Sequence, residues 1–464
     1  MRTYALAWAV VAVMAVSAAA AGEVNLGAAW QAAQQHDPAF AAARAQWDAG
    51  RTQDQQARAL WLPSLSATGS AGRGALDSHT SGAAFAAPGF GSTTDVDFQT
   101  SITGGTATRW SVMAEQPLFD AARLAGAREL KAGARMAAEQ YRAARQDLIL
   151  RTARSYFDVL NAAAQVETLE RLRAAAERTG AEAQARYDAG DIPVTDMREA
   201  QAMADAIGVQ QLEARNTLAL AQAAFSDLTG LDAGNLARVQ AGTGADAPAP
   251  EGLDTWTRRA LAGSPLLAQQ RLAQERAAAD VGRYGVLTAP RISLVAQAGR
   301  ESLRGDGDFG AANVTGRQAS VALQASVPLF TGGMRSAQRH EARALERRAS
   351  AELDGAGQQV QQGTRAAWLS LTTAAARVQA LQRLHASAAS RLDATRTGVE
   401  AGGRTTLELL GAEGDYLRAE ADLLRAQTQW LLAGLELAAV AGELDGAEVA
   451  SVDEHLAAGA AKDP

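Results

Sequence analysis

The residues best suited to chemistry in this sequence follow a pair of glycines, Gly402 and Gly403, in the stretch GGRTTLELL. Thr405 and Glu408 have the T-x-x-E spacing of a capping box, in which two side chains satisfy free N–H groups at a helix start. Arg404 adds a cation that can bind a carboxylate through a charge-assisted link. The stretch is therefore a well-capped helix start, a place where an opening is held shut, or both.

The usual signatures of enzymes are missing from the sequence. Its two lysines, Lys131 and Lys462, lie outside any G-x-x-x-x-G-K-[ST] loop, and neither H-E-x-x-H nor G-x-S-x-G occurs. The five histidines lie far apart, and the lack of cysteine excludes disulfides, thiolate metal sites and a cysteine nucleophile. We therefore expect no enzymatic activity, no cofactor and no bound metal.

Composition and charge narrow the class of protein further. Charged residues make up 20% and aromatic residues 5% of the 464 residues, which favours long helices over a compact aromatic core. The formal net charge of −7 argues against a nucleic-acid partner. Arg2, an apolar run and the small residues 18–21 predict a secretory signal peptide over residues 1–21. No later segment has 18 uncharged apolar residues, so a membrane-embedded mature chain would have to use β-strands.

An internal duplication organises the chain. Landmarks of the first copy recur in the second at offsets of 211 to 227 positions, and four such landmarks in the same order are hard to obtain by chance. The pairs are Pro38 with Pro265, Pro63 with Pro290, Pro117 with Pro328, and Gly190 with Gly402.

Each copy is expected to contain a helix, a strand, a loop, a strand and two long helices joined by a turn. The long-helix segments are nearly free of proline, which permits helices on the order of 100 Å at 1.5 Å per residue. The first copy, residues 22–230, is expected to have strands 64–72 and 108–117 and long helices 120–189 and 195–230. The second copy, residues 256–444, is expected to have strands 291–300 and 318–328 and long helices 334–399 and 405–442. Residues 231–255 connect the copies, segments 72–105 and 301–316 are expected to be loops, and residues 445–464 a disordered tail.

The expected strands and helices differ in their periodicity. Segments of about 10 residues with weak alternation fit transmembrane strands, although soluble hairpins give the same pattern. A repeat every seven residues predicts coiled-coil seams, which a soluble antiparallel coiled coil explains equally well. The alternating strand residues are Val321, Leu323, Ala325 and Val327, and one seam contains Leu371, Val378, His385, Leu392 and Val399.

With these elements in place, the sequence resembles the TolC family of outer-membrane efflux and export channels over residues 25–444. The motifs that carry the resemblance are, in order, DPAFAAARAQW, LPSLSA, QPLF, YDAGDIPVTDMREAQA, LTG, VPLFTGG and GGRTTLELLGAEGDYL. The resemblance implies a mixed α/β membrane protein in the outer membrane of a Gram-negative bacterium. Each protomer of a homotrimer would contribute four transmembrane β-strands to a 12-stranded barrel, continued by a long antiparallel coiled-coil helical barrel in the periplasm.

The resemblance also implies that the turns between the long helices form a periplasmic gate. Arg404 falls on the family's linking arginine and Glu408 on an acidic residue of its inner ring. Thr195 and Asp196 fall on the positions that receive the link. The turns themselves are expected at Gly190, Gly402 and Gly403.

Two positions depart from the family pattern. The second acidic residue of the ring falls on Gly411, and the linking tyrosine falls on Val399. We therefore expect a gate with fewer polar contacts and a single acidic tier.

Within the family, the sequence looks most like the branch that serves type I protein secretion. Three features carry this similarity: the sequence of the last motif, the DP dipeptide that begins the first motif, and the missing lipid-anchor cysteine. The implied function is a passive exit duct for a protein substrate, driven by an inner-membrane ABC transporter through a periplasmic adaptor (membrane fusion protein) and surrounded by outer-membrane lipid. One alternative is the outer-membrane duct of a proton-driven multidrug or metal efflux pump. Another, from a different class, is a soluble periplasmic coiled-coil adaptor.

Overall fold

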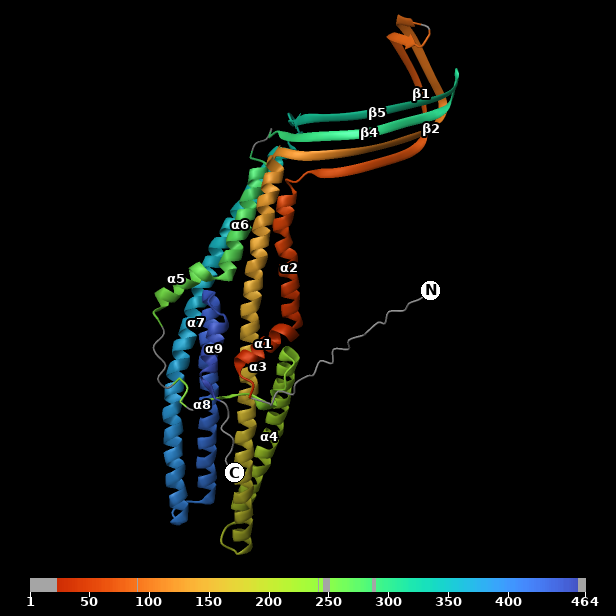
Figure 1. Cartoon of the computed structure of the whole chain (residues 1–464). Helices are drawn as coiled ribbons and strands as arrows, with labels where there is room; N and C mark the ends of the chain where they lie inside the picture. The colour runs from red at the N-terminus through yellow and green to blue at the C-terminus, as the bar shows by residue number, and fades with distance from the viewer. Residues whose placement is uncertain (1–22, 90, 241, 245–250, 286–288, 458–464) are drawn as a thin grey trace, which may run out of the picture. The chain divides into compact units, whose positions relative to one another are not determined.

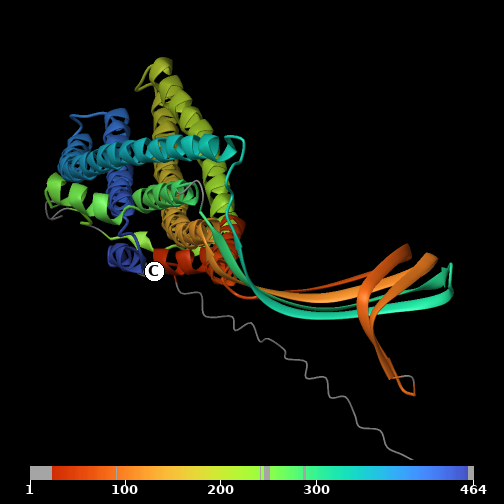
Figure 2. The same ribbon diagram turned by 90° about the horizontal axis from the view of Figure 1, so that it is seen from above.

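The computed structural model describes residues 23–89, 91–240, 242–244, 251–285 and 289–457 (Figures 1 and 2). The expected signal peptide lies outside the described residues. The chain forms two compact units. The helical unit comprises the chain through residue 47, residues 139–269 and the chain from residue 354, and the strand unit comprises residues 48–138 and 270–353. Both units contain residues of both copies, so the copies are not separate domains.

Each copy opens with two short helices that are separated at a proline, where a single helix was expected. Proline disfavours helical backbone at the residue that precedes it. The first helix of each pair therefore ends before that residue. The pairs are α1 (Leu26–His36) with α2 (Pro38–Ala59), and α5 (Leu253–Gly263) with α6 (Pro265–Arg283).

Four long helices follow the strands, and their bounds lie within one residue of those expected. They are α3 (Ala121–Asp188), α4 (Val194–Thr229), α7 (Met334–Glu400) and α8 (Thr406–Ala441). Gly230 and Gly442, at equivalent positions, end α4 and α8 in left-handed backbone with φ of 72° and 77°, which glycine adopts without strain. No helix in the described ranges is both long and apolar enough to span a membrane.

The helical unit has an apolar core in which α3 packs against α4 and α8 (Figure 1). Tyr156 of α3 is its largest fully buried side chain. The Tyr156 hydroxyl donates to the carbonyls of Val24 at 2.9 Å and Ala237 at 2.8 Å, and burial raises the pKa of this phenol. One buried donor thus ties the start of the described chain to the connector after α4.

The segment after α8 is ordered through residue 457, so the prediction of a disordered tail is wrong for residues 445–457. Helix α9 (Gly446–Asp453) begins with a capping box of Asp445 and Glu448. The strand β6 (Leu456–Ala457) pairs with β3 (Arg238–Val239). Strand β3 follows the short 3-10 helix η1 (Ala233–Asn235) in the chain. The Asp453 carboxylate accepts the N–H groups of Leu26 and Gly27 at the start of α1. The stretch ELDGAEVASV, residues 443–452, did not reveal this docking, because its two buried valines, Val449 and Val452, are too few to form a recognisable pattern. Residues 458–464 lie outside the described part.

The strand unit contains one antiparallel sheet in the order β1-β2-β4-β5 (Figure 2). Its strands are β1 (Ser64–Ala87), β2 (Gly91–Asp120), β4 (Arg291–Gly307) and β5 (Gly310–Ser326). The prediction of loops over residues 72–105 and 301–316 is therefore wrong, since most of these residues belong to strands. Glycine, serine and threonine are typical of loops. Here, however, backbone hydrogen bonds to the neighbouring strands keep these residues extended, and neither face of the sheet requires large apolar side chains at these positions.

The register gives the sheet one apolar and one polar face, because successive side chains alternate between faces. We define the apolar face by the rows Leu65–Ala114–Ala296–Val321 and Ala67–Val112–Ala298–Ala319. The intervening row, Ser66–Met113–Gln297–Ser320, lies on the polar face. This alternation is typical of a sheet with lipid on one side and water on the other.

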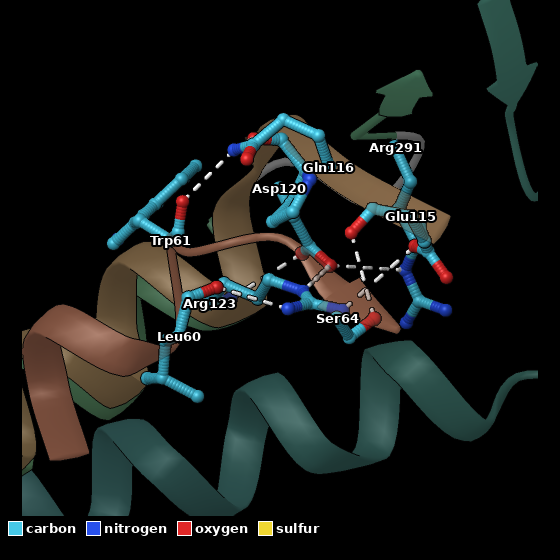
Figure 3. Close-up of polar contacts among 9 residues, drawn as sticks. Leu60, Trp61, Ser64, Glu115, Gln116, Asp120, Arg123 and Arg291 are labelled. Carbon is cyan, nitrogen blue, oxygen red and sulfur yellow. Dashed lines mark hydrogen bonds and ion pairs between the residues drawn. The ribbon is translucent and has the colours of Figure 1, made fainter. Parts of the chain in front are cut away.

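Strand β2 passes directly into α3 through a polar junction (Figure 3). The Asp120 carboxylate accepts the backbone N–H of Ala122 at 2.8 Å, and Arg123 donates to the carbonyl of Leu60 at 2.9 Å. Gln116 donates to the carbonyl of Trp61 at 2.8 Å. In the second copy, by contrast, the chain reaches α7 through Gly332 and Gly333, both with positive φ. The two junctions have therefore diverged since the duplication.

Candidate functional site at the helix tips

The turns α3–α4 and α7–α8 lie at the same end of the helical unit (Figure 1). At the α7–α8 turn, Gly402 has φ of 75°, and the N–H groups of Gly403 and Arg404 both donate to the carbonyl of Gly398, at 2.9 and 3.1 Å. These bonds satisfy the Gly398 carbonyl in the last turn of α7, and the chain reverses within five residues. The expected turn at Gly402 and Gly403 is therefore present.

The Glu408 carboxylate is fully engaged within its own chain. One oxygen accepts from Arg404 Nη1 at 2.8 Å and the other from the Thr405 backbone N–H at 2.8 Å. In return, the Glu408 N–H donates to Thr405 Oγ1 at 3.1 Å, which completes the expected capping box. The backbone bond from Thr405, followed by the bond from Arg404, lowers the pKa of the Glu408 carboxyl.

The α3–α4 turn is built differently. Gly190 has φ of 85°, and the backbone N–H of Asp191 donates to the carbonyl of Arg186 at 2.8 Å. Pro193 stands at the N-cap of α4 and makes no side-chain capping bond. Thr195 Oγ1 donates to Asp196 Oδ1 at 3.0 Å.

Asp196 and Glu408 are equivalent positions, each the third residue of its helix. Proline has neither a hydroxyl nor an N–H group, so Pro193 cannot form a capping box with Asp196 as Thr405 does with Glu408. Asp196 is exposed, and in the described part of the chain its carboxylate accepts one hydrogen bond, from the Thr195 hydroxyl. The turns thus present one neutralised carboxylate and one available carboxylate.

The structure does not join Arg404 to Asp196 within one chain. Among the described residues, Arg404 bonds Glu408 instead, since a partner one helical turn away needs little ordering. A link from Arg404 to Thr195 or Asp196 between neighbouring helices, or between copies, stays a prediction.

A second set of polar contacts behind the tips was not predicted. Asp415 of α8 accepts from Arg391 of α7 at 2.7 Å and from Arg418 at 3.1 Å. Arg171 of α3 pairs with Glu420 of α8 at 2.9 Å. These charges flank the heptad seam, which is where coiled coils place pairing residues, so heptad numbering could have found them.

His385, placed in the seam by its spacing, packs there against Tyr416 with ring centroids 5.0 Å apart. Within the part of the chain that the structure describes, no group of three His, Asp or Glu side chains could hold a metal ion.

The comparisons with known proteins decide the family. The sequence matches the family described as outer membrane efflux protein over residues 29–231 and 256–443. The chain belongs to this family. It is an outer-membrane channel protein with a periplasmic helical portion, in agreement with the resemblance to TolC proteins.

Two relatives illustrate the breadth of the family. The alkaline protease secretion protein AprF of Pseudomonas aeruginosa is 27% identical over 429 residues, covering 92% of this chain and 86% of AprF. The outer membrane protein TolC of Vibrio cholerae is 28% identical over 334 residues, covering 70% of this chain and 74% of TolC.

The fold is also that of a solved outer membrane protein. The outer membrane protein VceC of Vibrio cholerae superposes with a TM-score of 0.70 at 19% identity, over 90% of this chain and 96% of VceC.

Proposed function

We propose that the chain is the exit duct of a type I protein secretion system, acting as a homotrimer in the outer membrane. The sheet is the observation that carries this proposal. Its two edges, β1 and β5, are 24 and 17 residues long and have no neighbour on their outer sides in the described chain. A long edge strand exposes unpaired backbone N–H and C=O groups, which can bond to a strand of another chain. Further copies of the same sheet can therefore pair edge to edge until a 12-stranded barrel closes.

The similarity to AprF, a protein named for the secretion of a protease, supports a protein as the substrate. The duct itself would catalyse no reaction. An inner-membrane ABC transporter would supply the energy and reach the helix tips through a periplasmic adaptor, while outer-membrane lipid surrounds the apolar face of the sheet.

The helix tips would form the gate of this duct. Three copies of Asp196 and Glu408 around one axis would give a ring of carboxylates that favours cations. Arg404 would lower the charge of that ring by pairing with Glu408, as it does within the chain. Gly190, Gly402 and Gly403 allow the tight turns that bring these side chains to the opening.

Deletion of the gene tests the substrate class. The secretion proposal predicts that specific proteins disappear from the culture medium while antibiotic and metal sensitivity stay unchanged. An unchanged set of secreted proteins together with increased drug or metal sensitivity would favour the alternative, a duct for a proton-driven efflux pump. The mass of the purified complex tests the assembly, because three chains are expected and a monomer would favour a soluble adaptor.

A further inference from the structure

The apolar face of the sheet ends at a row of large and basic residues. In the register, Gly69 of β1 lies opposite Trp110 of β2, which lies opposite Arg300 of β4, which lies opposite Arg317 of β5. This row follows Ala67–Val112–Ala298–Ala319 by two residues, so its side chains lie on the same face. A further four residues along that face, Arg73 and Arg304 share a row. We call Arg300, Arg317, Arg304 and Arg73 the arginine group.

The arginine group has no internal counter-charge. Beyond the backbone pairing of the strands, no side-chain hydrogen bond or ion pair joins any of its four members to another described residue. Arg300 and Arg317 are directly opposite one another, and like charges in that arrangement destabilise a sheet. Asp306, two residues beyond Arg304 on the same face, forms no ion pair with it. The sheet therefore holds positive charge in an unfavourable arrangement unless an anion binds there.

The polar face shows the contrast. Arg109, one residue from Trp110, points to the opposite side and donates to both carboxylate oxygens of Glu301 at 2.8 Å. Arginine on that face is neutralised within the protein, whereas arginine on the apolar face is not.

The depth of the arginine group in the membrane follows from strand geometry. Ile292 and Arg300 are eight residues apart on β4, which is about 27 Å along the strand at 3.4 Å per residue. A strand tilt of about 40° reduces this to roughly 20 Å of height, near the ~25 Å apolar band of outer-membrane proteins. Arg291 begins β4, at the end of the strand that follows helix α6 in the chain. We therefore assign Arg300 and Arg317 to the outer boundary. Trp110 has the position of an interfacial aromatic residue there.

We propose that the arginine group binds the phosphate groups of a phosphorylated glycolipid of the outer leaflet, whose acyl chains lie along the apolar face. Guanidinium groups bind phosphate through paired charge-assisted hydrogen bonds, and basic clusters beside an apolar surface recognise anionic lipid head groups. This site rests on the location of the sheet in the outer membrane but not on the nature of the exported substrate.

The experiment uses the purified full chain and counts bound lipid A by native mass spectrometry. The test variant is Arg300→Gln with Arg317→Gln. The control is Arg109→Gln, which removes the same kind of charge from the opposite face one residue away. A conservative variant, Arg300→Lys with Arg317→Lys, retains the charge and checks that loss of binding is not loss of fold.

The expected loss of affinity for bisphosphorylated lipid A is about five-fold for each arginine removed, and about 25-fold for the double glutamine variant. The Arg109→Gln variant should bind as the wild type does, and the double lysine variant should retain most of the binding. Dephosphorylated lipid A should bind the wild type more weakly than lipid A binds the double glutamine variant, because Arg304 and Arg73 remain in that variant.

Equal affinity for both lipids, or equal losses in Arg109→Gln and the double glutamine variant, would overturn the proposal. Displacement of lipid A by millimolar inorganic phosphate would also overturn it, since that would indicate a site for the free ion. Ion conductance separates this proposal from the proposed function, because the double glutamine variant should still conduct.

Discussion

Asp196 and Glu408 occupy the same position in the first turns of α4 and α8, yet only Glu408 is held by its own helix cap. Thr405 donates its N–H to Glu408 at 2.8 Å, whereas Pro193, at the equivalent cap, has no N–H to donate. One substitution between the copies thus leaves a carboxylate free at one tip and bound at the other.

Replacement of either carboxylate should reduce the cation preference of the channel, because each removes one negative charge per protomer from the proposed ring. Asp196→Asn should do so without a structural effect. Glu408→Ala should also loosen the start of α8, because it removes the carboxylate that accepts the Thr405 N–H in the capping box. Reversal potentials in a salt gradient measure selectivity, and hydrogen exchange of residues 406–409 measures the helix start. Unchanged reversal potentials in both variants would exclude these residues from the pore.

Arg404→Ser should raise the conductance of the closed channel, because it removes the link proposed to hold the tips together. The matched control is Arg396→Ser, which removes an exposed arginine of α7 whose side chain bonds no other described residue. Single-channel recordings of the two variants provide the comparison. Equal conductance in Arg404→Ser and the wild type would contradict the role of this residue in the gate.

The capping contribution of Glu408 should persist through mildly acidic pH. Its pKa is lowered by the Thr405 and Arg404 bonds. The stabilisation is therefore fully present above the pKa of an unfolded glutamate and is lost only as the pH falls through the lower folded value. Hydrogen exchange of the first turn of α8 as a function of pH should show protection well below pH 5. Loss of protection near the pKa of a free glutamate would contradict the bonded geometry.

Asp37→Asn should destabilise the helical unit by about 2 kcal/mol, the usual contribution of a hydrogen bond to a charged group. Asp37 is buried, accepts the N–H of Phe40 at 3.0 Å and pairs with Arg151 at 2.7 Å. Burial raises its pKa, but the bond and charge of Arg151 outweigh burial and lower it overall. Ser264→Ala, at the equivalent position of the second copy, should cost much less, since its described bonds are through the backbone. Urea unfolding at fixed protein concentration measures both, and equal effects would contradict the role of the ion pair.

The duplication allowed the long helices to be predicted, because the proline and glycine pairs mark the ends of each element in both copies. The strands were underestimated because pairing with neighbours, which a single sequence does not reveal, determines where they end. In the segment GALDSHTSG, for example, Leu76, Asp77, Ser78 and His79 all pair with β2.

The candidate site was predicted in its parts but not in its pairing. The capping box of Thr405 and Glu408 depends on residues three positions apart, so spacing was enough to identify it. Whether Arg404 binds Glu408 or Asp196 depends on the geometry between helices, which spacing does not reveal. Within one chain, Arg404 binds Glu408, the partner one helical turn away. The docking of Asp453 on α1 joins residues 427 positions apart and left no local pattern.

Ion conductance of the purified protein in a planar lipid bilayer tests the central claim most directly. A closed barrel continued by a gated helical tunnel predicts discrete, cation-selective conductance steps, with larger steps for Arg404→Ser than for the wild type. The absence of conductance at every voltage, from protein shown to be inserted in the bilayer, would contradict the assignment of this chain as a channel.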